Sequence, residues 1–190
     1  MGYPVEKKAQ IHSELALLLP RLASFATALT GHEGAAQALL KSTRTQALAR
    51  AAKERGHTPL ILWTLYLMHG LWASRMKAQS EKAGAVEPRL FQPRSLAQGG
   101  HPAQTARMAK FIAQLPPQQR ATLHLVYGER LSYDEVADVF GVAVSTVMTR
   151  LARCHQALHH FEDYGSAATM PTGTVQRPAQ EGPRGREWAA

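Results

Sequence analysis

Apolar side chains in the first 78 residues recur every three or four positions, which is the spacing of an amphipathic α-helix. The first such run ends at Thr30-Gly31, where glycine is a typical helix stop. A second run, from Ala35 to about Arg55, is rich in strong helix formers, and a third extends from Leu60 to about Lys77. The pattern therefore predicts a three-helix block over residues 1–78.

The pattern changes after residue 78. Prolines and glycines are frequent in residues 79–104, so this stretch is predicted to be a flexible linker. Helical spacing returns over residues 105–164, and residues 165–190 are expected to be disordered because they lack apolar periodicity. The predicted helices of this second block are Thr105–Gln114, Pro117–Gly128, a short one from Tyr133 and a longer one from about Val144. No strand-like alternation is visible, so we expect an all-α protein of two small helical domains joined by the linker.

The second block contains the signals of a helix-turn-helix. Ser132 and Glu135 have the spacing of a capping box, in which each side chain satisfies a free amide at a helix start. Gly141 follows the short helix, where a tight exit requires positive φ. The helix from Val144 has apolar residues at steps of four, three and four, namely Val147, Leu151, Cys154 and Leu158. This spacing predicts that one side of the helix is buried.

Burial of that side turns short polar residues and arginines outward near the start of the helix. In a helix-turn-helix this part of the second helix meets base edges in the major groove, and arginines beside it hold phosphates. The predicted DNA-binding residues are Ser145, Thr146, Met148, Thr149, Arg150 and Arg153. A plain helical hairpin in a bundle is the alternative, but the capping box, the glycine turn and the exposed arginines together favour DNA binding.

Three stretches carry a family resemblance: Leu-Pro-Pro-Gln-Gln-Arg at 115–120, Leu-Ser-Tyr-Asp-Glu-Val-Ala at 131–137, and Val-Ser-Thr-Val-Met-Thr-Arg-Leu at 144–151. In order and spacing they resemble region 4 of extracytoplasmic-function sigma factors. The resemblance implies that this block recognises the −35 promoter element. Met148 departs from the family, which often has Lys at this position.

The first block resembles sigma region 2 less closely, in residues 18–31 and 63–72. The second of these stretches is similar to the family's helix that engages the −10 element and aids strand opening. The resemblance implies a DNA-contacting set of His69, Trp72, Arg75 and Lys77, in which aromatic rings stack on unpaired bases. Trp63 and Tyr66 are expected in the core instead, because aromatic residues at helical spacing usually pack there.

Between these stretches the family carries an acidic helix that docks on the clamp of RNA polymerase. Here residues 34–46 contain no carboxylate, and the corresponding contact residues are Gln37, Lys41 and Arg44. A basic helix cannot form the family's ion pairs with the clamp. His69, Gly70 and Ser74 also stand where the family commonly has Arg, Asn and Asp. Region 2 is therefore interpreted as degenerate.

Charge supports an anionic partner but does not locate it. The formal net charge is +8, and residues 1–77 hold ten Lys and Arg against four Asp and Glu, whereas residues 106–164 hold six of each. The basic excess therefore lies in the first block, away from the helix-turn-helix. Cys154 is the only cysteine, and no apolar run is long enough to span a bilayer. We expect a cytoplasmic protein with no membrane partner.

The sequence shows no motif for a cofactor or for catalysis, so no enzyme is expected. His155 and His159 have a spacing that allows a shared metal, with Cys154 beside them. Because Cys154 falls on the predicted buried side and the histidines do not, we expect solvated histidines at a helix end and no metal site.

The leading hypothesis is a sigma factor that binds core RNA polymerase and promoter DNA. The family resemblance adds an anti-sigma factor as a partner, and the stretches at 115–120 and 131–137 resemble the general-stress-response branch most closely. Two alternatives stay open. One is a sigma-like decoy that binds an anti-sigma factor, which the missing acidic helix and Met148 favour. The other is a stand-alone helix-turn-helix regulator that uses the second block alone.

Overall fold

The structure is a computed structural model that describes residues 3–82 and 102–167. Within these ranges every regular element is helical, which confirms the all-α prediction. The elements are α1 (Tyr3–Thr30), α2 (Glu33–Glu54), α3 (Leu60–Lys82), α4 (Pro102–Gln114), α5 (Pro117–Leu123), the π-helix η1 (His124–Gly128), α6 (Tyr133–Phe140) and α7 (Val144–Ala167).

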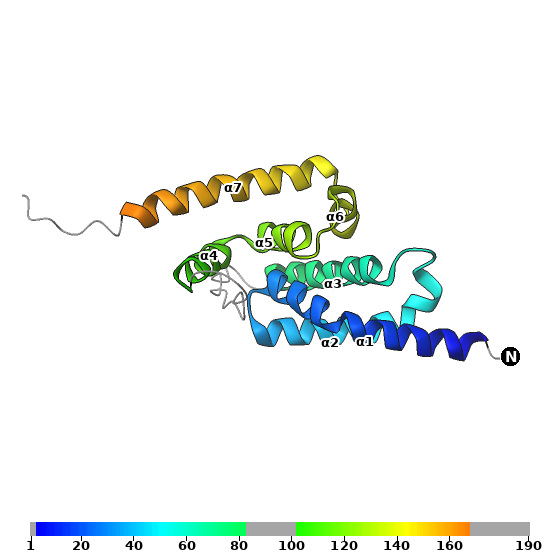
Figure 1. Cartoon of the computed structure of the whole chain (residues 1–190). Helices are drawn as coiled ribbons and strands as arrows, with labels where there is room; N and C mark the ends of the chain where they lie inside the picture. Colours follow the sequence, from blue (N-terminus) through cyan, green and yellow to red (C-terminus); the bar gives the residue numbers. More distant parts are fainter. Residues whose placement is uncertain (1–2, 83–101, 168–190) are drawn as a thin grey trace, which may run out of the picture.

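Helices α1, α2 and α3 form the first block, as the apolar spacing predicts (Figure 1). Each helix turns its apolar side toward the other two, and the fully buried side chains include Leu22, Phe25, Leu39, Leu65 and Met68. The tight connection between α1 and α2 is possible because Gly31 adopts a φ of 69°, which costs glycine little.

Helices α4 to α7 form the second block, and their order matches the predicted one. The predicted helix over Pro117–Gly128 is divided, because α5 ends at Leu123 and a single π-helical turn follows. A small separate core lies between α4 and α7, where the Phe111 and Phe161 rings are 5.5 Å apart beside the buried Cys154.

Two predicted boundaries shift. Helix α3 continues to Lys82 and α4 begins at Pro102, so both ends of the predicted linker over 79–104 are helical. Helix α7 continues to Ala167, three residues beyond the predicted end of the second block. The middle of the linker and the tail from residue 168 lie outside the described residues.

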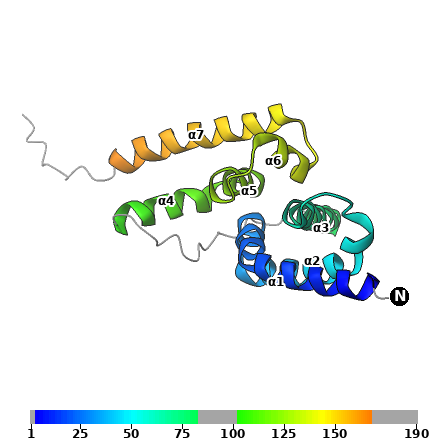
Figure 2. The same cartoon turned by 45° about the vertical axis from the view of Figure 1, so that its right-hand side comes forward.

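The two blocks pack against each other (Figures 1 and 2). They share one hydrophobic core. Helix α6 lies on α3, and α5 lies on α1. Val136, Val139 and Phe140 of α6 are buried in the same cluster as Phe25 and Met68 of the first block. Burial of one such side chain stabilises the contact by about 1.5–3 kcal/mol. The apolar side of the short helix α6 therefore joins the two blocks.

Candidate nucleic-acid interface

Both ends of α6 have the predicted geometry. The Glu135 amide donates to Ser132 Oγ at 3.2 Å, and the Ser132 amide donates to Glu135 Oε2 at 2.8 Å, which completes the capping box. Gly141 ends α6 with a φ of 64° and a ψ of 41°, in the left-handed region. The capping box fixes where α6 begins, and the left-handed Gly141 fixes where α6 ends and how the chain turns toward α7.

Helix α7 buries the predicted stripe, with Val147, Leu151 and Cys154 in the interior and Leu158 partly buried. The opposite side of its first turns is open, and Met148 is 55% exposed. A small hollow of about 370 Å³ lies at this end of the helix. The residues that line it are Gln118, Ser145, Thr146, Thr149, Arg150 and Arg153, which include five of the six predicted DNA-binding residues.

Arg150 is held in place by groups from two other helices. Its Nη2 donates a hydrogen bond of 2.8 Å to Gln118 Oε1 of α5, and its guanidinium carbon lies 5.1 Å from the centre of the Phe140 ring of α6. Burial lowers the pKa of Arg150 below its ordinary value. The guanidinium thus stands at the edge of the hollow in a defined position, whereas Arg153 is exposed.

The four residues expected to contact the −10 element do not form one open surface. Trp72 is only 8% exposed and belongs to the core, which corrects its expected place at the surface. The His69 ring is half-buried and packs between Trp72 and Phe140, with ring centres 5.9 Å and 5.0 Å away. Arg75 donates to Ser42 Oγ and to the Ala38 carbonyl of α2, while Lys77 is exposed.

Of the two neighbouring aromatic residues expected in the core, one is there and one is not. Trp63 packs partly buried against the core, as predicted, but the prediction for Tyr66 is wrong because its side chain is 56% exposed. Helix α3 is packed on one side by α1 and α2 and on another by α6. This arrangement buries the side that carries Trp72 and leaves Tyr66 outside.

The residues expected to contact polymerase all lie on the exposed side of α2. Gln37, Lys41 and Arg44 are exposed, and Gln37 donates to Glu33 Oε1 at 3.1 Å. Their direction follows from the buried side of α2, which consists of Ala36, Leu39, Thr43, Ala47 and Ala51. The basic character of this helix therefore appears at the surface.

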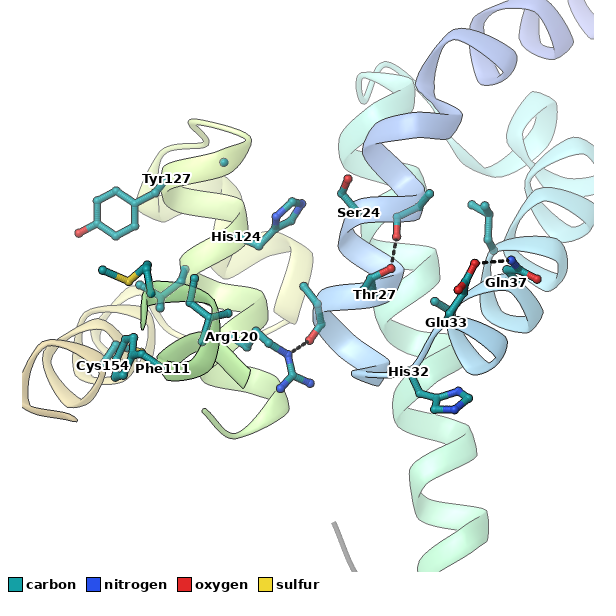
Figure 3. Close-up of a pocket in the computed structure, with 18 of the residues that line it drawn as sticks. Ser24, Thr27, His32, Glu33, Gln37, Phe111, Arg120, His124, Tyr127 and Cys154 are labelled. Carbon is teal, nitrogen blue, oxygen red and sulfur yellow. Dashed lines mark hydrogen bonds between the residues drawn. The ribbon is translucent and has the colours of Figure 1, made fainter. Parts of the chain in front are cut away.

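Sequence reasoning missed a groove between the two blocks, with a volume of about 1390 Å³ (Figure 3). Its walls come from α1 and α2 on one side and from α4, α5, η1 and α7 on the other. The apolar part of the lining includes Leu40, Met108, Phe111, Ile112, Leu123 and Leu158. The lining residues come from helices that are far apart in the sequence, so no local sequence signal points to this space.

Arg120 at the end of the 115–120 motif borders this groove and ties α5 to α1. Its Nε donates to the Ala28 carbonyl at 2.6 Å (Figure 3). Its Nη1 donates to the Leu115 carbonyl at 3.0 Å. Only 5% of the residue is exposed, and burial lowers its pKa to about 10. A buried arginine that satisfies two carbonyls is a structural link between the blocks.

A carboxylate makes a second polar link. Glu129, which follows η1, accepts a hydrogen bond from Arg21 of α1, and its other oxygen lies 3.5 Å from His124 Nε2. The interaction with His124 and the contact with Arg21 lower the pKa of Glu129 below its ordinary value, although burial opposes them.

No group of three metal-ligating side chains occurs among residues 3–82 and 102–167. Burial raises the pKa of the Cys154 thiol to about 11, and His155 Nε2 lies 3.3 Å from the Tyr127 hydroxyl oxygen. None of the helices in these ranges is long and apolar enough to cross a bilayer.

Comparisons with known proteins agree with this geometry. The family model described as "Sigma-70, region 4" matches residues 105–158. The ECF RNA polymerase sigma factor EcfG of Rhodopseudomonas palustris (strain TIE-1) is 26% identical over 174 residues, covering 84% of this chain and 92% of the relative.

Solved structures show the same fold. The sigma factor RpoE in complex with the anti-sigma factor NepR from Bartonella quintana matches with a TM-score of 0.67 at 22% identity, over 80% of this chain and 95% of that one. The PhyRSL–NepR complex from Sphingomonas sp. Fr1 matches with a TM-score of 0.58 at 22% identity, over 92% and 99% of the two chains.

Proposed function

We propose that this chain, which belongs to the extracytoplasmic-function group of the sigma-70 family, directs RNA polymerase to promoters by placing α7 on the −35 element. The observation that carries the proposal is the open end of α7, where short polar side chains surround a hollow bordered by Arg150. Phe140 and Gln118 hold the guanidinium before any ligand arrives, so less conformational entropy is lost on binding.

Within this interface we assign two kinds of contact. Ser145, Met148 and Thr149 face outward and would approach base edges, because their side chains are short or flexible. Thr146, Arg150 and Arg153 would hold the phosphates on either side. The base contacts would choose the sequence, and the phosphate contacts would set the orientation of the helix in the groove.

The remaining partners are proposed from the relatives and from the groove. We assign core RNA polymerase to the first block, through the exposed side of α2. Three similar structures are complexes with the anti-sigma factor NepR, and we place a helical segment of such a protein in the groove between the blocks. The apolar lining of that groove suits one side of an amphipathic helix. We place the protein in the cytoplasm and its target genes in a general stress response.

Binding to purified core polymerase, followed by transcription from a pool of promoter fragments, tests the proposal. A complex that initiates transcription supports it, provided that Arg150→Ala abolishes initiation and leaves the complex intact. His57→Gln is the matched control, because His57 is exposed in the turn between α2 and α3. If the wild-type chain forms no complex with core polymerase, sigma activity is excluded.

A decoy that binds an anti-sigma factor is the second candidate. The exposed Lys41 and Arg44 on α2 favour it, because a decoy has no need of the polymerase clamp. The anti-anti-sigma factor PhyR from Bartonella quintana, in its complex with NepR, has a related fold with a TM-score of 0.50 at 14% identity, over 76% of this chain and 47% of that one. Binding to an anti-sigma factor without binding to core polymerase would identify a decoy.

A stand-alone regulator is the third candidate, and the shared core disfavours it. Removal of the first block would expose Val136, Val139 and Phe140, which are buried in the shared cluster. Sequence-specific binding by residues 102–167 alone, as a folded fragment, would support this candidate.

A further inference from the structure

The small hollow at the start of α7 is built from two helices. Gln118 of α5 lines it together with five residues of α7, namely Ser145, Thr146, Thr149, Arg150 and Arg153. Every one of these side chains carries an N–H or O–H donor, and none carries a carboxylate. The hollow therefore suits an anion whose oxygens accept hydrogen bonds.

The hydrogen bond between Gln118 and Arg150 fixes which way the Gln118 amide is turned. A guanidinium has donors only, so the amide oxygen must face it, and Oε1 accepts from Arg150 Nη2 at 2.8 Å. The amide nitrogen Nε2 keeps two N–H donors, which bond to no residue within 3–82 and 102–167. Because Gln118 is exposed, these donors are open to a ligand that arrives from solvent.

Further donors around the hollow are also unused. Arg153 is exposed and forms no ion pair with a carboxylate in the described part of the chain, and the Thr146 hydroxyl bonds to none of its residues. Arg150 Nη1 is covered and has no acceptor there. By contrast, the Thr149 hydroxyl donates to the Ser145 carbonyl at 2.8 Å and is not free for a ligand. Unused donors therefore face the hollow from both helices.

These donors lie beside the base-facing side of α7 and not on it. Thr146, Arg150 and Arg153 recur at steps of four and three, so they share one flank of the helix. The bond to Gln118 shows that this flank faces α5. The side proposed to approach base edges, which carries Met148, is turned away from it by roughly a third of a turn. When a recognition helix lies in the major groove, its flanks run along the phosphate backbones.

We propose that the hollow seats one phosphodiester of the DNA backbone, to which Gln118 donates from Nε2 while Arg153 supplies the positive charge. Gln118 then has two roles, since its oxygen holds Arg150 and its nitrogen contacts the DNA. The inference rests on the proposed function in taking α7 as the helix that lies in the groove. It adds α5 to the interface and narrows the phosphate contact to the flank of α7 that faces α5.

A phosphate held from two helices restricts how α7 can turn in the groove. Contacts to the backbone set the register and orientation of a protein on the duplex, and a contact from α5 fixes a second point. Because Gln118 is neutral, this contact is distinct from the general attraction between a chain of net charge +8 and DNA. The contact can therefore be separated from nonspecific binding by experiment.

Replacement of single phosphates by uncharged methylphosphonates tests the contact. The probe is a duplex that the full wild-type chain selects from a random pool, remade as a series with one methylphosphonate in each member. Fluorescence anisotropy measures the affinity for each. Gln118→Met, which has neither donor nor acceptor for these contacts, should bind the unmodified duplex roughly three- to tenfold more weakly than the wild type. At one backbone position only, the methylphosphonate should cost this variant roughly threefold less affinity than it costs the wild type.

Gln118→Lys separates a direct contact from an effect through Arg150, because lysine supplies a donor to the phosphate but no acceptor for the guanidinium. This variant should bind the unmodified duplex at least as tightly as the wild type and steepen the slope of log affinity against log salt by about one. Gln114→Lys is the matched control, since it adds the same charge at an exposed position of α4 outside the hollow and should leave the slope unchanged. Circular dichroism verifies that each variant is folded.

Two results overturn the inference and leave the proposed function in place. One is a Gln118→Met variant with the affinity and the methylphosphonate pattern of the wild type. The other is a Gln118→Lys variant that binds as weakly as Gln118→Met, since Gln118 then acts only through Arg150. A wild-type chain that selects no duplex and initiates no transcription with core polymerase overturns the proposed function itself, and this contact with it.

Discussion

Arg21 of α1 donates a hydrogen bond from Nε to the Glu129 carboxylate across 108 residues of sequence, and so connects the first block to the second. Most of the Glu129 side chain is covered, with 7% exposed, whereas that of Arg21 is 42% exposed. Together with Arg120, this contact supplies polar links at the α1 side of an interface whose other side, between α3 and α6, is apolar.

Replacement of Glu129 should weaken the link between the blocks. Glu129→Gln removes the charge and should lower the free energy of unfolding at pH 7 by about 1–3 kcal/mol, the usual contribution of a hydrogen bond between charged groups. The pKa of Glu129 lies below 4.5, so its contribution is present above that pH and is lost as the pH falls further. Urea unfolding at pH 7 and at pH 3.5 measures both effects. The free energies of unfolding of the variant and the wild type should differ less at pH 3.5 than at pH 7.

Glu54→Gln is the matched control for this prediction. Glu54 also pairs with an arginine, Arg50 at 2.7 Å, but both side chains are exposed on α2. Exposed pairs contribute little to stability, so this variant should unfold like the wild type. If both variants lose the same free energy of unfolding, the contact between Arg21 and Glu129 stabilises the protein no more than an exposed ion pair does.

Arg120 should be among the most sensitive positions in the chain. Arg120→Ala removes the donors to the Ala28 and Leu115 carbonyls and leaves both carbonyls in a covered site, at a cost of about 3 kcal/mol or more. Arg120→Lys should recover little, because one ammonium group cannot reproduce the planar fork of a guanidinium. Denaturant midpoints measure the loss, and Arg107→Ala, at an exposed position of α4, should change the midpoint very little. A wild-type midpoint for Arg120→Lys would contradict the fork geometry.

The local parts of this fold could be predicted from the sequence because their causes are local. The capping box of Ser132 and Glu135, the turn at Gly141 and the buried stripe of α7 depend on residues a few positions apart. The exposed set on α7 followed from that stripe and from the helical period. Five of the six residues expected to bind DNA line one hollow at this end of α7.

The contact between the blocks could not be predicted in the same way. An apolar pattern shows that Phe140 must be buried but does not identify its partner, which is His69 from a helix 71 positions earlier. Trp72 was expected outside and Tyr66 inside for the same reason, since the helices packed around α3 decide which of its sides is covered. The groove and the roles of Arg120 and Glu129 depend on how the two blocks pack. The sequence pattern does not reveal that packing, so it predicts neither the groove nor these roles.

The basic surface of α2 provides a test of how the chain engages polymerase. Lys41→Glu combined with Arg44→Glu restores the acidic character that the family has on this helix. Both side chains are exposed, so the fold should be unaffected. If the chain has kept the family's docking mode, affinity for core polymerase should rise by roughly tenfold, because a repulsion is replaced by an attraction. Pull-down with purified core enzyme at two salt concentrations measures this change in affinity.

Lys53→Glu is the control for this pair of substitutions, because it reverses one exposed charge near the end of the same helix. It should change binding much less than the double variant. A double variant that binds no better than the wild type, while the wild type binds well, would show that α2 docks in a different way from that of the family.

Met148 offers the most direct test of the DNA-binding helix. Met148→Lys introduces the residue that the family often has, at a position that is 55% exposed beside the hollow of α7. One added phosphate contact should raise the affinity for duplex DNA roughly three- to tenfold at low salt, and should steepen the slope of log affinity against log salt by about one. Gln156→Lys adds the same charge to an exposed position two turns later, beyond the expected contact, and should leave the slope unchanged. If the two variants change the slope equally, the gain reflects only net charge, and the first turns of α7 do not lie in the groove of the DNA.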